Sequence, residues 1–348
     1  MISYWLLFFL PLTAVVLLPR SLAVDARKFG WMVMGVVAAI AIGLRHEVGA
    51  DWERYLEIYD FISGEEFLSA LAVTDPSYAA ANWLSARLGW GIYGVNLLCG
   101  ILFAAGVGAF CIRQPMPWLA WLVATPVLMV TVAMGYSRQG AALGLAFWSL
   151  AYLEEKRVWL FVLLVTLGAT FHRSAALLLP FAFLAQDRTR WIQLLGLALV
   201  ALLAGSVFLL EHFEPLWSTY IEAQMVAEGG PIRAWMNALP AAIMLAMNRR
   251  WTRRWPDPGH WRWLAWLAIG CVFLVGMASS AVDRVALYLL PLQIYVWSRI
   301  PLLFADRATR TAVVLGICLV YAAVLWVWLN FAINAPDWLP YKNILLPW

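Results

Sequence analysis

The chain has 348 residues, of which 64% are hydrophobic and only 13% are charged. This composition excludes an ordinary soluble domain and indicates a helical membrane protein with several spans. The net charge of +4 says little by itself, whereas the 22 tryptophans fit the belts that aromatic rings form at membrane interfaces.

Apolar stretches recur along the whole chain. The first has no basic n-region and no small-residue cleavage site, so we expect a retained span rather than a signal peptide. We predict an all-α polytopic membrane protein of about 12 spans that forms a single domain over residues 1–348. The sixth and seventh spans are short and also fit a helical hairpin that does not cross. The predicted spans are 4–19, 29–44, 93–112, 118–134, 140–153, 158–171, 174–185, 191–210, 232–247, 263–281, 285–297 and 311–330.

A long polar insert, residues 45–92, separates the second and third spans. It opens with seven ionisable groups within thirteen residues, beginning at Arg45, and an apolar span that ends in such a cluster places it at a membrane surface. If a helix begins at Asp51, then Asp51, Tyr55 and Tyr59 lie one turn apart on one face. A carboxylate and two phenols so arranged suit sugar hydroxyls. Alternatively, Asp51 only caps the helix and the charges are solvated.

A second helix start within the insert is the pair Asp75-Pro76, with Asp as N-cap and Pro at the first helical position. The helix that it predicts, residues 76–88, is too polar and too short to span a bilayer. We therefore expect the insert to carry short interfacial helices that lie on the membrane surface or dip into it.

The loops predict the orientation, because cytoplasmic loops of membrane proteins are rich in Lys and Arg. One set of loops contains 16 basic and 6 acidic residues, which leaves 8 of the 24 basic and 14 of the 20 acidic residues to the other set. The first set is predicted to be cytoplasmic, which places the insert and both termini in the periplasm. Its basic residues are Arg20, Arg27, Lys28, Arg113, Lys156, Arg157, Arg188, Arg190, Arg249, Arg250, Arg253, Arg254, Arg262, Arg299, Arg307 and Arg310.

The stretch 249–255, with the sequence RRWTRRW, combines arginines with aromatic residues, a pattern that can bind nucleic acid. The same pattern fits a cytoplasmic loop that meets anionic lipid headgroups, and we favour this interpretation. We therefore predict membrane lipids, and no nucleic acid, among the partners.

Polar residues also gather at four places on the predicted outer side, three of them in turns of two to five residues between apolar stretches. An arginine held at membrane depth costs about 2.5–3.5 kcal/mol on insertion scales, so four on one side are expected to have a function. The clusters are Arg45, His46, Glu47 and Asp51; Tyr136, Ser137, Arg138 and Gln139; His172, Arg173 and Ser174; and Asp283 and Arg284.

The four arginines, Arg45, Arg138, Arg173 and Arg284, suit a lipid phosphate or pyrophosphate. A guanidinium stays charged and donates in a planar fork that matches phosphate oxygens, and preorganised charge of this kind stabilises a leaving pyrophosphate. Structural alternatives exist for three of them: Arg284 as an adjacent pair with Asp283, Arg138 as a snorkelling side chain, and Arg173 as a headgroup contact.

Two residues are candidates for the general base that activates a sugar hydroxyl. His172 has a side chain that titrates near neutrality, and Asp51 is a carboxylate in the charged insert. The sequence leaves the choice open, and His172 also fits a hydrogen-bonded histidine at a helix end. His46 and His172 share no strict metal-ligand spacing and no cysteine partner, so we predict no metal and no cofactor.

These residues resemble the motifs of a known family. The pattern Arg45-x-x-Val48-Gly49-x-Asp51-x-x-x-Tyr55 resembles the signature near the start of the EpsG family of Wzy-like polysaccharide polymerases. One departure is Ala50-Asp51-Trp52, where the family pattern has a hydroxyl residue before the Asp and often Tyr after it. Further similar segments are Arg138-Gln139, Phe171-His172-x-Ser174-Ala175, Arg284 with Tyr288, and the closing Pro340-Tyr341-Lys342-Asn343.

The resemblance implies a polymerase at the outer face of the bacterial inner membrane. Such an enzyme transfers a growing glycan from undecaprenyl pyrophosphate onto a hydroxyl of the next lipid-linked repeat unit, without a nucleotide sugar. Undecaprenyl-pyrophosphate-linked oligosaccharides and a chain-length regulator are the implied partners, besides membrane lipids. Carried over residue by residue, Arg45, Arg138, Arg173 and Arg284 bind pyrophosphate, Asp51 or His172 is the base, and His46, Glu47, Tyr55, Gln139, Asp283 and Tyr288 bind sugar or support the site.

Two other functions compete with polymerisation. One is a ligase, or a transferase that adds single sugars from a lipid donor. The other is a flippase or transporter of lipid-linked oligosaccharides, which requires charged groups near the bilayer midplane and a path open to both sides. The interiors of the long predicted spans are almost free of charge, which disfavours transport.

Overall fold

The computed structural model describes residues 1–18, 24–184, 229–255, 259–276 and 279–346, together with Trp191, Ala198 and Leu202. In this part of the chain every regular element is a helix, besides one isolated antiparallel bridge between Arg45 and Asn343. The all-α prediction is therefore confirmed for the described residues.

The elements are, in order, α1 (Ile2–Leu17), α2 (Val24–Gly43), α3 (Trp52–Ser63), α4 (Phe67–Ala70), α5 (Pro76–Arg87), α6 (Gly91–Ile112), α7 (Pro117–Ala124), the π-helix η1 (Thr125–Ala133), α8 (Ser137–Glu154), α9 (Val158–Phe171), the 3₁₀ helix η2 (Arg173–Leu178), α10 (Phe181–Leu184), α13 (Gly229–Ala246), α14 (Asn248–Arg254), α15 (His260–Leu274), α16 (Ser279–Trp297), the 3₁₀ helix η3 (Ile300–Leu303), α17 (Arg307–Phe331) and the 3₁₀ helix η4 (Ala335–Trp338).

Four of the described helices are long and apolar enough to cross a bilayer: Val24–Gly43, Gly91–Ile112, Val282–Leu303 and Arg307–Phe331. Shorter apolar helices cover Ile2–Leu17, Pro117–Ala133, Val158–Phe171, Arg173–Phe183 and His260–Leu274. The chain is therefore a helical membrane protein. The predicted number of about 12 spans stays a prediction, and the predicted span 191–210 lies outside the described residues, apart from three single positions.

Two predicted spans differ from the helices of the structure. The predicted span 174–185 is divided into η2 and α10, with Pro180 between them. The predicted span 263–281 is wrong at its end, because α15 ends at Leu274 and α16 already begins at Ser279. Asp283 and Arg284 therefore lie in the first turns of a helix and not in a short connecting turn.

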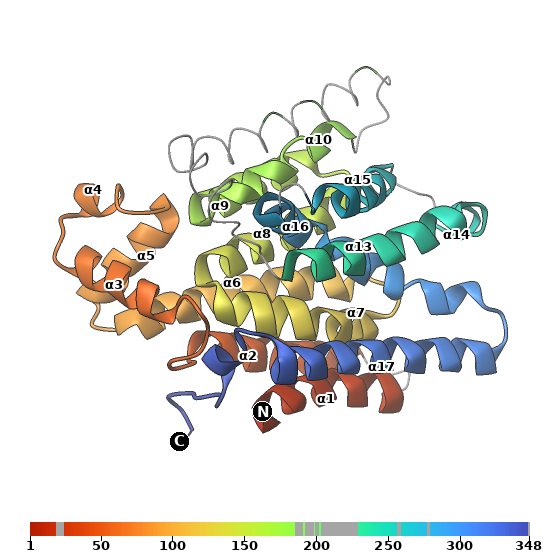
Figure 1. Cartoon of the computed structure of the whole chain (residues 1–348), viewed down its shortest axis with the longest axis horizontal. Helices are drawn as coiled ribbons and strands as arrows, with labels where there is room; N and C mark the ends of the chain where they lie inside the picture. The colour runs from red at the N-terminus through yellow and green to blue at the C-terminus, as the bar shows by residue number, and fades with distance from the viewer. Residues whose placement is uncertain are drawn as a thin grey trace.

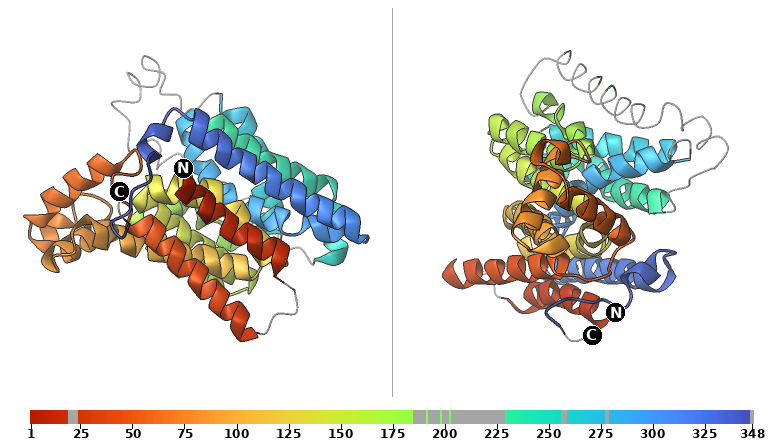
Figure 2. Two further views of the ribbon diagram at one scale, coloured as in Figure 1. Left: turned by 90° about the horizontal axis from the view of Figure 1, so that it is seen from below. Right: turned by 90° about the vertical axis from the view of Figure 1, so that its left-hand side faces the viewer.

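The insert forms the three short helices α3, α4 and α5, which project together beyond the ends of the bundle helices (Figures 1 and 2). Helix α5 begins at Pro76 with Asp75 as its N-cap residue, as predicted. The placement of these helices at a membrane surface stays a prediction.

In the bundle, α6 packs between α2 and α8, and the crossing of α6 with α8 depends on two glycines. A Cβ atom added at Gly106 would lie 1.8 Å from the carbonyl oxygen of Gly144, so neither position has room for a side chain. Close approach through small residues is a common way for membrane helices to associate. This contact fixes the start of α8, and with it Arg138, relative to α6.

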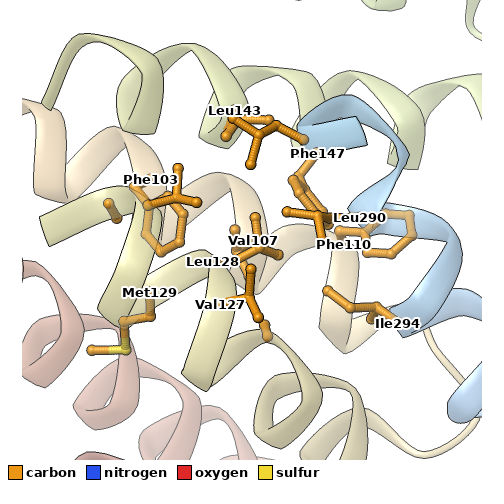
Figure 3. Packing of buried hydrophobic residues seen from close by; sticks show 14 of the residues in the cluster. Phe103, Val107, Phe110, Val127, Leu128, Met129, Leu143, Phe147, Leu290 and Ile294 are labelled. Carbon is orange, nitrogen blue, oxygen red and sulfur yellow. The ribbon is translucent and has the colours of Figure 1, made fainter. Parts of the chain in front are cut away.

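The core lies where α6, η1, α8 and α16 meet, and Figure 3 shows its side chains converging from these four elements. Burial of these rings and branched chains holds together helices that are far apart in sequence. The residues labelled there are Phe103, Val107, Phe110, Val127, Leu128, Met129, Leu143, Phe147, Leu290 and Ile294.

One long element, η1, is a π-helix, and the C-terminal segment forms a hydrogen bond to it. A π-helix changes the hydrogen-bond ladder of a helix, and such segments often occur at functional sites. The indole N–H of Trp338 in η4 donates to the carbonyl of Val130 in η1 at 2.8 Å. The Tyr4 hydroxyl donates to the carbonyl of Trp338 at 2.6 Å, so α1, η1 and η4 are joined at one end of the bundle.

Charged and polar residues of the predicted cytoplasmic set gather at the other end. Arg113 Nε donates to Glu155 Oε1 at 2.8 Å, Trp261 Nε1 donates to Glu154 at 3.1 Å, and Arg299 Nη1 donates to Gln114 at 2.5 Å. These described residues thus lie at the end of α6 opposite to the insert, because α6 begins at Gly91 directly after the insert and ends at Ile112.

The basic stretch 249–255 forms α14 and the residue after it. Trp251 has only 1% of its surface exposed and packs against Tyr295 and Trp255. Its ring is therefore covered and does not offer a face for base stacking, while the surrounding arginines are exposed.

Candidate active site

A hydrogen bond from the insert to the bundle positions the candidate site. Ser77 Oγ in the first turn of α5 lies 2.7 Å from Thr170 Oγ1 near the end of α9. Because Asp75 precedes α5, and His172 and Arg173 follow α9, this contact brings three polar residues of two distant segments to one end of the molecule.

A polar cavity of about 540 Å³ opens at this junction. Three arginines and two carboxylates line it, so its charged side chains carry a net positive charge. Such a cavity suits an anionic ligand. The lining residues are Arg54, Glu57, Ile58, Ala72, Val73, Thr74, Asp75, Pro76, Arg138 and Arg173, of which Arg138 and Arg173 belong to the arginines predicted for pyrophosphate.

Arg138 lies in the first turn of α8 and is held from several sides. Its Nη1 donates to Thr74 Oγ1 at 2.7 Å and to Asp75 Oδ2 at 3.2 Å. The guanidinium lies 5.9 Å from the ring centre of Tyr55 and 5.8 Å from that of Tyr78, distances typical of cation–π contacts. Its buried Nε has no hydrogen-bond partner in the part of the chain that the structure describes. Arg138 is therefore fixed in the cavity wall.

Asp75 is a site residue that the sequence analysis missed. It occupies the N-cap position of α5, but its carboxylate makes no capping hydrogen bond and instead accepts from Arg138. The Asp-Pro pair located the helix start correctly. It did not reveal where the side chain points, because that depends on α8, more than 60 residues away.

Asp51 occupies the N-cap position of α3, and its side chain makes no capping hydrogen bond either. The Tyr55 hydroxyl lies 3.5 Å from Asp51 Oδ2, which is a long hydrogen bond. Burial raises the pKa of Asp51 above its ordinary value, and the charges of Arg54 and Arg138 and the contact with Tyr55 oppose this. A carboxylate with a raised pKa beside an arginine-lined cavity has the properties of a general base.

His172 is linked to α16 through Ser174. The backbone N–H of Ser174 donates to His172 Nδ1 at 3.3 Å, and Ser174 Oγ lies 2.6 Å from the same nitrogen. Ser174 Oγ also lies 3.0 Å from the hydroxyl of Tyr288. Ser174 and Tyr288 are buried, so this series joins the turn after α9 to α16.

Arg45 lies in the turn after α2 and is almost fully buried. It has 1% of its surface exposed and donates to the carbonyls of Ile42 (2.5 Å) and Val48 (3.1 Å) and to Ser137 Oγ (2.7 Å). These bonds tie the turn after α2 to the start of α8. The geometry therefore gives Arg45 a positioning role, and its contact with pyrophosphate stays a prediction.

His46 and Glu47 contact the C-terminal segment and are not among the residues that line the described cavity. His46 Nδ1 lies 2.7 Å from the Tyr93 hydroxyl. The backbone N–H of His46 donates to the backbone carbonyl of Lys342 at 3.1 Å. Glu47 forms an ion pair with Lys342, which lowers the pKa of Glu47. Among the described residues, no group of three metal-ligating side chains includes His46 or His172.

Gln139, next to Arg138, has 8% of its surface exposed, and its Nε2 has no hydrogen-bond partner within the described residues. A buried amide of this kind is unusual, because most buried polar groups are paired. It supports the prediction that Gln139 belongs to the site, although Gln139 itself is not among the residues that line the cavity.

Asp283 pairs with Arg233 of α13, which the sequence analysis did not include. Arg233 Nη2 donates to Asp283 Oδ2 at 2.7 Å, and Arg233 Nε donates to Asp283 Oδ1, so the pair is bidentate. The ion pair of Asp283 that the described residues show is therefore with Arg233. Arg284 lies in the first turns of α16 at the same end of the bundle and is not among the residues that line the described cavity.

Tyr136 lies directly before α8, and several of these charged groups influence its pKa. Burial raises its pKa, the charges of Asp51, Asp283 and Asp337 raise it further, and Arg233 lowers it. Asp337 reaches this region because its carbonyl accepts the N–H of Gly49 at 2.8 Å. Gly49 has φ +106°, and an added Cβ would lie 2.5 Å from the Met134 carbonyl, so the turn before Asp51 requires glycine.

Comparison with known proteins gives one match. The model of the EpsG family matches residues 28–343, which include every predicted site residue. Neither a curated protein nor a solved structure matches the chain. A match over nearly the whole length confirms the resemblance that the motifs indicated: the chain belongs to the EpsG family.

Proposed function

We propose that this protein is a polysaccharide polymerase of the bacterial inner membrane. It transfers a growing glycan from undecaprenyl pyrophosphate onto a hydroxyl of the next lipid-linked repeat unit at the periplasmic face. Membership of the EpsG family supports this function. The observation that carries it is the cavity lined by Arg138 and Arg173, at the end of the bundle that also holds Asp51.

The cavity is the proposed site of the donor pyrophosphate. Phosphate oxygens match the planar fork of a guanidinium, and three arginines against two carboxylates leave positive charge for them. Thr74 and Asp75 hold the Arg138 guanidinium in place before the substrate arrives. Such preorganised charge is usually the largest single contribution to the stabilisation of a leaving group.

The reaction then needs a base for the acceptor. The bond between the anomeric carbon and the pyrophosphate oxygen breaks, and its electron pair leaves with the pyrophosphate. The acceptor oxygen bonds the anomeric carbon, and its proton passes to Asp51. General-base catalysis contributes roughly 10²–10⁴-fold. Asp51 suits this step because its raised pKa makes it a stronger base than an exposed carboxylate.

The other predicted residues support these two parts of the site. Arg45 fixes Ser137 and hence the start of α8, while Tyr55 contacts both Asp51 and Arg138. Arg284 and Gln139 supply donors at the same end of the bundle. Partners are the lipid-linked oligosaccharides, membrane lipids and a chain-length regulator.

Substitution of the arginines tests the proposal. We expect Arg138→Ala and Arg284→Ala to leave only single lipid-linked repeat units on a glycan gel, with unchanged amounts of protein in the membrane. The matched control is Arg87→Ala, because Arg87 is an exposed arginine of the insert that donates to the Glu65 carbonyl. Normal chain length in both variants would contradict the proposal.

Purified protein in detergent separates the competing functions. A polymerase converts lipid-linked repeat units into a ladder and releases undecaprenyl pyrophosphate. A transferase of single sugars gives one product band, a ligase moves finished glycan to another acceptor, and a transporter gives no turnover.

A further inference from the structure

The cavity at the junction of the insert and the bundle has two walls of different chemistry. Arg138 in α8 and Arg173 in η2 come from the bundle. Helix α3 of the insert contributes a second wall, the α3 wall, which consists of Arg54, Glu57 and Ile58. The proposed diphosphate site relies on the arginines of the bundle, so the α3 wall is open to another part of the substrate.

The α3 wall is one face of a regular helix. Glu57 and Ile58 follow Arg54 by three and four residues, the spacing that places side chains on the same face. Tyr55 lies on another face, because only 2% of its surface is exposed. Asp51 precedes Arg54 by three residues, and the charge of Arg54 is one of those that lower the pKa of the Asp51 carboxyl group against the effect of burial. The face therefore runs from the proposed base along the cavity.

The two carboxylates of the cavity differ in their partners. Asp75 accepts a hydrogen bond from Arg138 at 3.2 Å, whereas the exposed Glu57 forms no hydrogen bond or ion pair within the described residues. An unpaired carboxylate repels a diphosphate, so the anionic part of the substrate does not belong beside Glu57. A carboxylate accepts hydrogen bonds, which sugar hydroxyls donate. Arg54 is also exposed and makes no such contact in that part of the chain, so it can donate to sugar oxygens.

Apolar side chains lie beside these two charged groups. Ile58 lines the cavity together with Ala72 and Val73, which belong to the segment before α5, and Val73 has 37% of its surface exposed. A sugar ring carries C–H groups between its hydroxyls and can cover such side chains, whereas a diphosphate has no apolar surface. Apolar lining with a few polar groups that fix orientation is common in sites for small ligands.

We infer that the α3 wall is the subsite for the acceptor saccharide: Glu57 accepts hydrogen bonds from sugar hydroxyls and Arg54 donates to sugar oxygens, while the donor diphosphate lies on the arginines of the bundle. This inference deepens the proposed function and rests on it. The saccharide is that of the acceptor because a general base has to reach the hydroxyl from which it takes the proton. The face of α3 that carries Arg54 and Glu57 begins at the proposed base, Asp51.

Two probes separate the walls in binding measurements on the full-length protein in detergent. The first is inorganic pyrophosphate, followed by calorimetry. The second is the free repeat-unit oligosaccharide, released by mild acid from the lipid-linked intermediates of cells without this protein and followed by saturation-transfer NMR. It carries neither lipid nor diphosphate, so it reports on the saccharide subsite alone.

We expect Glu57→Ala and Arg54→Ala to weaken oligosaccharide binding about 10–100-fold, because each removes hydrogen bonds to a charged group. Glu57→Gln keeps an acceptor oxygen and should recover part of the loss. Glu57→Ala should bind pyrophosphate at least as tightly as the wild type does, since it removes a negative charge from the cavity. Arg138→Ala should show the opposite pattern, with weaker pyrophosphate binding and unchanged oligosaccharide binding.

The matched controls are Asp60→Ala and Arg87→Ala, which remove exposed charged residues of α3 and α5 that are not among those lining the described cavity. Both should bind either probe as the wild type does. The inference is overturned if the wild type shows no saturation transfer, or if Glu57→Ala and Arg54→Ala bind the oligosaccharide normally. An equal loss in Asp60→Ala also overturns it, because the net charge of the insert would then explain the effect.

Kinetics distinguish a binding role from a catalytic one. Glu57→Ala should raise KM for lipid-linked repeat units about tenfold and change kcat by less than about threefold, whereas Asp51→Asn should lower kcat. A Glu57→Ala variant with the KM of the wild type and a reduced kcat would contradict the binding role.

The two proposals fail in different ways. If the wild type binds both probes in the expected pattern but makes no polymer from lipid-linked repeat units, the proposed function is wrong, and the acceptor role of the α3 wall is lost with it. If the wild type polymerises while Glu57→Ala and Arg54→Ala bind the oligosaccharide normally, only the inference about the α3 wall is wrong.

Discussion

Two opposing effects act on the pKa of the Asp51 carboxyl group. Burial raises this pKa, and the charges of Arg54 and Arg138 lower it by less, so the pKa is raised. The folded state then holds the proton more tightly than the unfolded state does. Ionised Asp51 therefore lowers the free energy of unfolding at neutral pH, and this loss of stability disappears as the pH falls through the raised pKa. We predict that Asp51→Asn raises the melting temperature at neutral pH while it abolishes polymerisation.

Thermal unfolding in detergent, measured beside the polymerisation assay, checks this prediction. Asp60→Asn is the matched control, because Asp60 is exposed on the same helix and does not line the cavity. Asp60→Asn should change neither the melting temperature nor polymerisation. A lower melting temperature for Asp51→Asn would show that the charges of Arg54 and Arg138 outweigh the effect of burial.

The pH dependence of catalysis provides a second prediction at this scale. Polymerisation should fall on the acid side as Asp51 becomes protonated, with a midpoint above the ordinary value of 3.8. Arg54 lowers the pKa of Asp51, so Arg54→Gln should move this midpoint to higher pH. The measurement is kcat/KM against pH. Arg87→Gln removes another exposed arginine from the insert and should leave the midpoint unchanged; a shift in both variants would point to the net charge of the insert.

At the scale of elements, the contact between η4 and η1 connects the C-terminal segment to the site. Trp338→Phe removes the indole donor to the carbonyl of Val130, which should lower the free energy of unfolding by about 0.5–1.5 kcal/mol. It should also reduce polymerisation, because Asp337 in η4 holds Gly49 and thereby the turn before Asp51. Denaturant unfolding and the glycan gel measure the two effects. Trp326→Phe, at an exposed position of α17, is the control.

Hydropathy located elements well where burial alone decides them, and poorly where hydrogen bonding does. Helix α9 has the bounds that were predicted for it, Val158–Phe171, since an uninterrupted apolar stretch defines it. Hydropathy cannot distinguish the π-helix η1 from an α-helix, because all nine residues of η1 are buried and leave no periodic pattern in the sequence. It also joined residues of α16 to the preceding span, so that Asp283 was expected in a turn.

The site was predictable only in part, for a related reason. Arg138, Arg173 and Asp51 were predicted because they are polar residues at the ends of apolar stretches, and the structure brings Arg138 and Arg173 together in one cavity. Asp75 and Arg233 carry no such local signal. Their roles depend on partners in α8 and α16, and such long-range pairs follow from the packing of helices and not from spacing along the chain.

For the whole molecule, the two ends of the bundle carry different charge. Among the described residues, the end with Arg113, Glu155 and Arg299 is the one predicted to be cytoplasmic, and the opposite end holds the insert and the cavity. Basic residues remain on the cytoplasmic side during membrane insertion, so this distribution predicts the orientation as well as the site. A polymerase whose substrate waits at the periplasmic face requires this orientation.

Labelling with a membrane-impermeant maleimide tests the orientation. Glu66→Cys is exposed in the insert and Lys156→Cys is exposed between α8 and α9, while the four native cysteines are buried. In intact spheroplasts we expect Glu66→Cys to react at once and Lys156→Cys to react only after permeabilisation. Both should react in detergent, and the native chain should stay unlabelled throughout. The reverse pattern would place the arginine-lined cavity in the cytoplasm, where the proposed periplasmic reaction has no access to it.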